Sequence, residues 1–148
     1  MTDRFLRFAP FILEWETEYN KDGSVRTEHD PDDPGGTTRY GIDQRSHPKV
    51  NIEALSKEQA TSIYFEEWLE CGIEQMPAKL GEAYFNVRVN AGESRAEKTL
   101  TRSGGDPGLF ISELERFYNS LAGEKPRMRK YLKGWLNRTT ALRKYLNL

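Results

Sequence analysis

The sequence predicts an α+β fold that is mostly α-helical, with a small β-hairpin inserted after the first long helix. Apolar residues recur every three to four positions over most of the chain, which is typical of amphipathic helices. Between residues 20 and 43 this spacing is lost, and Gly, Pro and Asp take its place. The 148 residues suit one domain, so we expect 1–148 to fold together, with a first part over 1–75 and a helical part over 76–148.

The first helix is expected to begin at Pro10, because a proline loses no hydrogen bond at a first helical position. Its apolar face contains Phe11, Ile12, Trp15 and Tyr19. Glu16 lies beside that face, near the helix end. Asp22-Gly23 then predicts a type I′ turn. The segment Asp30–Gly36 holds two prolines and two glycines, which excludes regular structure there.

Helix signals resume after the hairpin. Ser56 and Gln59 form a capping box for a helix that ends near Glu70. Further helices are expected to open at Pro77, at a second capping box of Ser94 and Glu97, at Asp106-Pro107 and at about Pro126.

The composition excludes several classes of protein. No run approaches the roughly 18 apolar residues of a membrane span, so we expect no membrane insertion. The N-terminal patch lacks a small-residue cleavage site, and we expect no signal peptide. A single cysteine, Cys71, excludes an internal disulfide. With only His29 and His47 beside it, we expect no metal site, and no cofactor.

Charge is divided unevenly along the chain. Residues 1–75 carry 8 Lys/Arg against 16 Asp/Glu, whereas residues 76–148 carry 14 against 7. The last helical stretch supplies Arg127, Arg129, Lys130, Lys133, Arg138, Arg143 and Lys144. Two interpretations stay open: a basic face for an anionic polymer, or ordinary solvated helix faces. No nucleic-acid motif is present, and we expect no nucleic-acid partner.

A glutamate at a helix end followed by an acidic turn region suits glycoside hydrolysis, which needs two carboxyl groups at a cleft. Glu16, between Trp15 and Tyr19, suits the proton donor. An aspartate of the 30–33 cluster, which contains Asp30, Asp32 and Asp33, suits the ionised partner in a polar hairpin. The alternative is that Glu16 is an ordinary solvated helix residue. A calcium-binding EF-hand loop is excluded, because Pro34 and Gly41 would occupy two ligand positions.

Several motifs in their order resemble glycoside hydrolase family 108. Its opening pattern, Glu-Gly-Gly-Tyr and then Asp-Pro-Gly-Gly-x-Thr-x-x-Gly-Ile, is similar to Glu16-Thr17-Glu18-Tyr19 and the segment from Asp33 to Ile42. Further similar segments are Ile63-Tyr64 with Trp68, Phe85, Val89-Asn90-x-Gly92 with Ala96 and Leu100, and Gly134-Trp135-Leu136-Asn137-Arg138.

The resemblance implies a lysozyme-like fold and a muramidase, which cleaves the β-1,4 bond between N-acetylmuramic acid and N-acetylglucosamine in peptidoglycan. The partner would be peptidoglycan glycan strands, with 76–148 resembling the family's peptidoglycan-binding segment. By position, Glu16 takes the role of catalytic acid. Asp33 is then the best candidate for the second carboxylate, and Thr38 supplies a hydroxyl that positions water.

Three further residues are predicted to contact substrate. Tyr19 and Tyr40 suit stacking on sugar faces, with a core position as the alternative. Asn90 suits a hydrogen bond to an N-acetyl group, or else it caps a helix end before Gly92. The chain departs from the family where Thr17-Glu18 replaces Gly-Gly, and a Glu18 side chain there would crowd a cleft or add a competing charge.

The family includes phage endolysins, so we expect a monomer that waits in the host cytoplasm for a holin or is carried in the virion. Two alternatives stay open for the activity. One is a catalytically inactive peptidoglycan-binding or phage structural module, which Thr17-Glu18 would favour. The other is a lytic transglycosylase, which needs only one catalytic acid.

Overall fold

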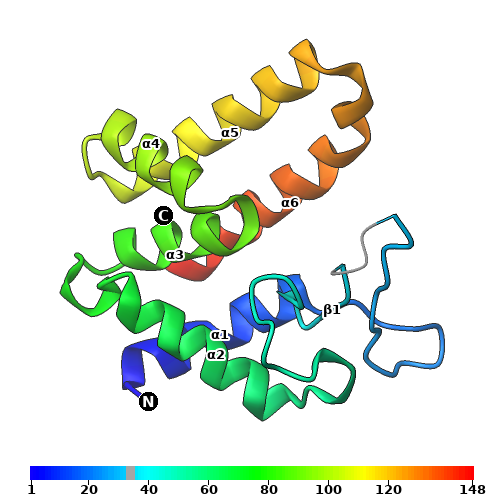
Figure 1. Cartoon of the computed structure of the whole chain (residues 1–148). Helices are drawn as coiled ribbons and strands as arrows, with labels where there is room; N and C mark the ends of the chain where they lie inside the picture. Colours follow the sequence, from blue (N-terminus) through cyan, green and yellow to red (C-terminus); the bar gives the residue numbers. More distant parts are fainter. Residues whose placement is uncertain (33–35) are drawn as a thin grey trace. The chain divides into compact units, whose positions relative to one another are not determined.

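The structure, a computed structural model, describes residues 1–32 and 36–148 (Figure 1). The chain divides into unit 1, Met1–Cys71, and unit 2, Gly72–Leu148. Six α-helices and one two-stranded antiparallel sheet lie in the described residues, which confirms the predicted mostly α-helical α+β fold with a small hairpin. Within those residues no helix combines the length and the apolar character of a bilayer-crossing segment.

Unit 1 contains two helices with a hairpin region between them. Its elements are α1 (Asp3–Glu16), β1 (Thr38–Arg39), β2 (Ile42–Asp43), the 3-10 helix η1 (Ile52–Ala54) and α2 (Lys57–Glu70). The predicted capping box of α2 is confirmed: the Ser56 hydroxyl accepts from the Gln59 backbone N–H at 3.1 Å, and the Gln59 side chain accepts from the Ser56 N–H at 2.9 Å.

The predicted start of α1 at Pro10 is wrong, because the helix begins at Asp3. Thr2 caps it by accepting a hydrogen bond from the Phe5 N–H at 3.2 Å. Pro10 lies inside the helix on its exposed side, which costs about 3 kcal/mol. Phe5 and Phe8 are 1% and 2% exposed, and burial of each stabilises the early turns by about 1.5–3 kcal/mol. Their burial therefore offsets the lost hydrogen bond.

An aromatic cluster packs α1 against α2. The Phe5 ring lies 5.0 Å from that of Phe65 and 5.5 Å from that of Trp68, centroid to centroid. Phe8 is 6.1 Å from Trp68 and stacks on Phe11 at 5.5 Å. Trp68 has no exposed surface, so it forms the centre of the unit 1 core.

A turn forms at Asp22-Gly23, but the predicted type I′ geometry is wrong. That type needs a positive φ at both central residues, and only Gly23 has one, at +85°. The Gly23 N–H donates to the Asn20 carbonyl, and the Asn20 N–H donates to the Ser24 carbonyl. The loop is therefore one residue longer than predicted, with Tyr19 paired to Val25.

Unit 2 is entirely helical in its regular structure. Its elements are η2 (Ile73–Gln75), α3 (Leu80–Ala91), α4 (Glu93–Ser103), α5 (Pro107–Glu124), η3 (Pro126–Met128) and α6 (Arg129–Leu146). The helix expected at Pro77 begins at Leu80. The second capping box, Ser94 with Glu97, is wrong: α4 begins at Glu93, after Gly92, whose positive φ of +90° turns the chain sharply out of α3.

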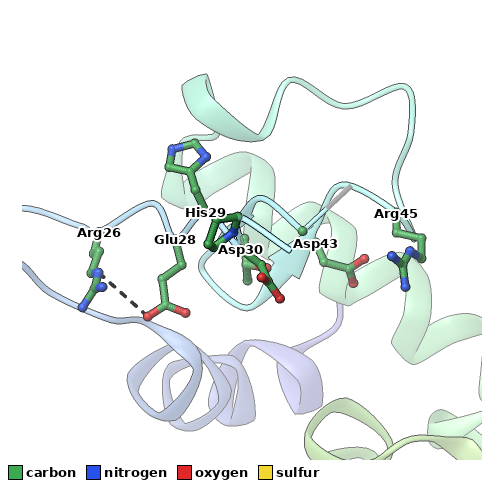
Figure 2. A pocket seen from close by; sticks show the side chains of 9 residues that line it. Arg26, Glu28, His29, Asp30, Asp43 and Arg45 are labelled. Carbon is green, nitrogen blue, oxygen red and sulfur yellow. Dashed lines mark ion pairs between the residues drawn. The ribbon is translucent and has the colours of Figure 1, made fainter. Parts of the chain in front are cut away.

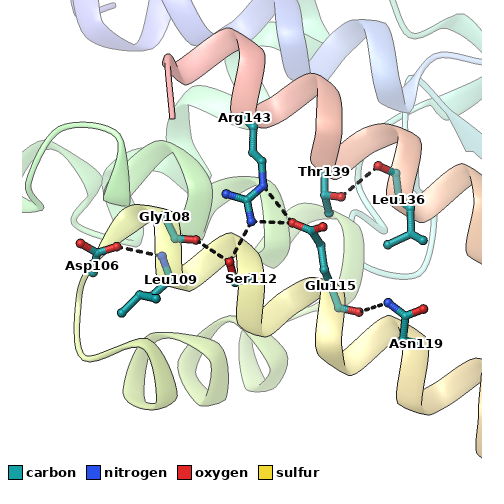
Figure 3. A network of polar contacts seen from close by, with 9 residues as sticks. All are labelled: Asp106, Gly108, Leu109, Ser112, Glu115, Asn119, Leu136, Thr139 and Arg143. Atoms are coloured by element: carbon teal, nitrogen blue, oxygen red, sulfur yellow. Dashed lines mark hydrogen bonds and ion pairs between the residues drawn. The ribbon is translucent and has the colours of Figure 1, made fainter.

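The side chain of Arg143 joins helices α5 and α6 through polar contacts (Figure 3). Asp106 caps α5, as predicted, by accepting from the Leu109 N–H at 2.8 Å. The Arg143 guanidinium, on α6, donates to the Glu115 carboxylate at 2.7 and 3.0 Å and to the Ser112 hydroxyl at 2.9 Å. One basic residue of the last helix thus has a structural partner on α5.

The Gly-Trp-Leu-Asn-Arg motif joins α6 to α3. Arg138 is 6% exposed, and its Nε donates to the Asn86 side-chain oxygen at 2.9 Å. Its Nη1 also lies 3.4 Å from the side-chain oxygen of Asn90. Because a buried guanidinium needs polar partners, this motif and the Val-Asn-x-Gly motif meet for a structural reason.

Candidate active site

Glu16 is the last residue of α1 and is half-buried. The helix ends there because the Thr17 backbone is extended, while its N–H and hydroxyl both donate to the Leu13 carbonyl. Thr17 is 9% exposed, and its side chain packs at the helix end with its hydroxyl bonded to the Leu13 carbonyl. The side chain of Glu18 is exposed.

A two-residue turn at Tyr40-Gly41 connects β1 to β2. Both residues have a positive φ, +55° and +76°, and the strand register pairs Arg39 with Ile42 on either side. This is the type I′ turn that the sequence predicts at Asp22-Gly23 instead. Tyr40 carries a side chain in the left-handed region, at a cost of about 1–2 kcal/mol.

Two side chains hold this turn in place. The Tyr64 hydroxyl, from α2, donates to the Tyr40 carbonyl at 2.7 Å in a buried hydrogen bond. Arg39 donates to the backbone carbonyls of Leu55 and Val25 at 3.0 and 2.9 Å. These bonds connect the short hairpin to three other segments of unit 1, and so they offset the strain at Tyr40.

The turn backbone lies directly against Glu16. A Cβ placed on Gly41 would lie 2.5 Å from the Tyr64 hydroxyl oxygen and 2.8 Å from Glu16 Oε2. No real Cβ tolerates such distances, so only glycine fits at this position. The glutamate at the end of α1, the hairpin turn and α2 therefore meet at one point.

The hairpin region also borders a cavity of about 600 Å³ (Figure 2). Its lining is Arg26, Glu28, His29, Asp30, Pro31, Gly36, Thr38, Asp43 and Arg45. Six of these residues have ionisable side chains, so the polar lining expected of the hairpin region is present. Figure 2 shows the Asp30 and Asp43 carboxylates within this cavity, with Arg26 paired to Glu28 at 3.8 Å.

Thr38 and Asp43 are direct partners across the β1–β2 ladder. Residues paired in this way project from the same face of a sheet, and both line the cavity. Thr38 is fixed by its backbone, whose N–H and C=O both bond to Glu28, at 2.9 and 2.8 Å. The hydroxyl predicted to position water thus has a carboxylate as its cross-strand neighbour.

Asp43 is held in its ionised form. Burial acts to raise the pKa of this carboxyl, but hydrogen bonds from the Ser46 N–H and hydroxyl and the nearby His47 outweigh it. The pKa therefore lies below its ordinary value of 3.8. The Ser46 N–H donates to Asp43 Oδ1 at 2.8 Å.

Asp43 is a site residue that the sequence patterns do not single out. The strand register could have identified Asp43, since a two-residue turn at Tyr40-Gly41 places it opposite Thr38. Of the acidic cluster, Asp30 lines the cavity and accepts a hydrogen bond from the Asp32 N–H at 2.9 Å. Asp33, the predicted second carboxylate, lies outside the described residues.

The predicted sugar-contact residues lie in different surroundings. The Tyr19 side chain is 60% exposed and follows α1, outside the helix that the sequence assigns to it. Tyr40 is 9% exposed, with the Arg39 guanidinium 5.4 Å from its ring centroid. Asn90 belongs to unit 2, where its side-chain N–H donates to the Tyr118 hydroxyl at 2.9 Å.

Within residues 1–32 and 36–148, no group of three or more His, Cys, Asp or Glu side chains is arranged to hold a metal ion. His29 and His47 each lie beside one glutamate, Glu53 at 3.0 Å and Glu67 at 3.5 Å respectively.

The mostly helical fold and its short hairpin define the lysozyme-like class of proteins. The chain belongs to glycosyl hydrolase family 108, because the sequence model of this family matches residues 9–92, more than half of the chain. The solved structure of SagA from Brucella abortus has the same fold, with a TM-score of 0.68 and 23% sequence identity. That match covers 95% of this chain and 91% of the SagA chain. A comparison with curated proteins gives no match.

Family membership makes the chain a glycoside hydrolase, of the peptidoglycan-hydrolase kind, with a glycan as its substrate. The matched range contains Glu16, the hairpin, Tyr64 and Asn90.

Gly41→Ala is predicted to destabilise unit 1 and to abolish most activity, because the new methyl group meets Tyr64 and Glu16. Gly23→Ala is the matched control: its φ is +85°, yet nothing lies within 4 Å of the added Cβ. We expect each variant to lose about 1–2 kcal/mol from backbone strain, and Gly41→Ala to lose more. Chemical denaturation and cell-wall hydrolysis measure both effects. Equal losses in the two variants would contradict the close packing.

Ionisation of Asp43 is expected to make the stability of unit 1 depend on pH. A lowered pKa in the folded state gives stability that is present above about pH 4 and is lost as pH falls through the folded pKa. We expect carboxyl NMR titration to give a pKa below 3.8 for Asp43. Ser46→Ala should raise it by removing the hydroxyl, while Ser46→Thr should leave it nearly unchanged. An Asp43 pKa that is the same in the wild type and in Ser46→Ala would show that the Ser46 hydroxyl does not stabilise the carboxylate.

Proposed function

We propose that this protein is a muramidase, which hydrolyses the β-1,4 bond between N-acetylmuramic acid and N-acetylglucosamine in peptidoglycan. One observation carries the proposal: the Glu16 side chain, at the end of α1, lies against the backbone of the Tyr40-Gly41 turn. The family match supports it, since both segments fall within residues 9–92.

In this proposal Glu16 protonates the glycosidic oxygen as the bond to the anomeric carbon breaks. Fixed placement is what such a donor needs, because proton transfer requires hydrogen-bond distance to the leaving oxygen. The glycine turn on one side and the helix end on the other limit the positions open to the Glu16 carboxyl. The positive charge that develops on the sugar ring then requires a second, ionised carboxylate.

Two residues are proposed for that second carboxylate. Asp33 has the position that the family resemblance favours. Asp43 is supported by its lowered pKa and by its place opposite Thr38 at the cavity. In either case the Thr38 hydroxyl helps to hold the water that attacks the anomeric carbon.

The surface near the hairpin suits a polar polymer. The cavity lining combines Asp30 and Asp43 with Arg26 and Arg45, which can bind hydroxyl, acetamido and carboxylate groups. Tyr19 presents an exposed aromatic ring, which we propose stacks on a sugar face. An endolysin role, with release to the wall through a holin or from the virion, is the biological part of the same proposal.

Glu16→Gln keeps the side-chain size and removes the proton donor, so we expect cell-wall hydrolysis to fall at least about a hundredfold. Glu14→Gln is the matched control, since Glu14 lies on the same helix with an exposed side chain. Purified sacculi are incubated with each protein, and the released fragments are identified by mass spectrometry. The wild type and Glu14→Gln should both release muropeptides with reducing N-acetylmuramic acid ends.

Three results would contradict the proposal in different ways. Full activity in Glu16→Gln would exclude Glu16 as the acid. Products with 1,6-anhydro ends would identify a lytic transglycosylase. Binding of the folded wild type to sacculi without any sugar ends would identify a non-catalytic binding module. Asp33→Asn and Asp43→Asn, assayed side by side, decide which carboxylate assists Glu16.

A further inference from the structure

Unit 2 has a cavity of its own, of about 390 Å³, lined by residues of α3, α4, α5 and α6. Its walls are mostly apolar and come from Phe117, Tyr118, Leu121 and Trp135. Three polar side chains, Asn90, Ser94 and Arg95, also line it. We call this cavity the Arg95 pocket. A concave, largely apolar site with a few polar groups is the usual form of a ligand pocket.

The aromatic wall is rigid. Trp135 stacks on Tyr118 with the ring centroids 4.9 Å apart, and on Tyr131 at 5.8 Å. Tyr118 is 3% exposed and its hydroxyl accepts a hydrogen bond from Asn90. Such a wall holds its shape before a ligand arrives, which lowers the entropy cost of binding.

The Asn90 amide is fixed as well. Its N–H donates to Tyr118 at 2.9 Å, and its oxygen lies 3.4 Å from Arg138 Nη1. With both ends engaged inside unit 2, this amide offers little to a ligand. The charge of the pocket therefore comes from Arg95, beside the neutral hydroxyl of Ser94.

Arg95 differs from two other arginines of unit 2, the half-buried Arg143 and the buried Arg138. Arg143 binds Glu115, and Arg138 binds Asn86. The Arg95 guanidinium instead lies over the Phe117 ring, 3.5 Å from its centroid, and within the described part of the chain it has no carboxylate partner. Burial, and then the charge of Arg102, lower the pKa of Arg95 below its ordinary value, against an opposing effect of Tyr118. The guanidinium remains cationic in this setting.

A half-buried cation without a counter-charge, set against apolar walls, is complementary to a carboxylate on an apolar body. An arginine binds a carboxylate through two parallel hydrogen bonds. A bare sugar ring carries many hydroxyl groups that these apolar walls would leave without partners, at a cost. A short peptide of small apolar side chains with free carboxylates fits both features.

We infer that the Arg95 pocket binds the peptide stems of peptidoglycan, with a stem carboxylate on Arg95 and alanine methyl groups against Phe117, Leu121 and Trp135. This inference rests on the proposed function for the identity of the polymer. It adds a second recognition element: the hydrolase contacts the glycan through unit 1 and the stem peptide through unit 2.

The test is a calorimetric titration of the full chain with a synthetic stem peptide, L-Ala-γ-D-Glu-L-Lys-D-Ala-D-Ala. The comparison ligands are the same peptide with every carboxyl amidated and a chitotetraose without carboxylates. We expect the free-acid peptide to bind and the amidated peptide to bind at least about tenfold more weakly. Arg95→Gln should cause a similar loss. Arg102→Gln, which removes the same charge from the same helix outside the Arg95 pocket, should change affinity by less than about twofold.

Three outcomes would overturn the inference: no binding of the peptide to the wild type, equal binding of the amidated peptide, or tighter binding of chitotetraose. Equal losses in Arg95→Gln and Arg102→Gln would also overturn it, by showing diffuse electrostatic attraction. The peptide arms need no hydrolysis, so they are independent of Glu16. On glycan strands stripped of peptides, Arg95→Gln should cleave as fast as the wild type, whereas Glu16→Gln should not cleave. Failure of the stem-peptide inference is thereby distinguished from failure of the proposed muramidase function.

Discussion

The contact between the Tyr40-Gly41 turn and Glu16 is the constraint on which the rest of unit 1 depends. The turn backbone reaches the carboxyl only because Gly41 has no side chain. The same turn forces Tyr40 into a left-handed conformation, which the Tyr64 hydroxyl stabilises by binding the Tyr40 carbonyl. Tyr64 in turn is positioned by α2, which the Phe5–Trp68 aromatic contact packs on α1. The candidate acid is thus fixed by core packing.

The basic residues of unit 2 serve different purposes. Arg138 is buried and joins α6 to α3, and Arg143 joins α6 to α5. The positive excess of residues 76–148 therefore includes residues with structural roles, besides any that face solvent. Among the residues that the structure describes, Arg95 has no carboxylate or amide partner; it lies over the Phe117 ring and borders an aromatic pocket. Its surroundings, more than the net charge, carry the inference about stem peptides.

Local chemistry predicts much of the fold. The capping residues Ser56 and Asp106 specify helix starts because their side chains bind backbone N–H groups a few residues away. The α1 start is not predictable from Pro10, because burial of Phe5 and Phe8 overrides the proline. The type I′ turn at Tyr40-Gly41 is missed for a similar reason. A tyrosine rarely adopts a positive φ, and at Tyr40 a hydrogen bond from the Tyr64 hydroxyl, in a distant segment, stabilises this conformation. Glu16 is a candidate because of its place near the helix end and the family resemblance, whereas Asp43 requires the strand register.

A double-mutant cycle of Gly41→Ala and Tyr64→Phe tests the central contact most directly. The free energy of unfolding and the rate of cell-wall hydrolysis are measured for the wild type, both single variants and the double variant. Loss of the Tyr64 hydroxyl should relieve part of the clash with the new methyl group. The double variant should then lose less stability than the sum of the single losses, by more than about 0.5 kcal/mol. Additive losses would show that the turn and Tyr64 do not meet at Glu16, which would contradict the account.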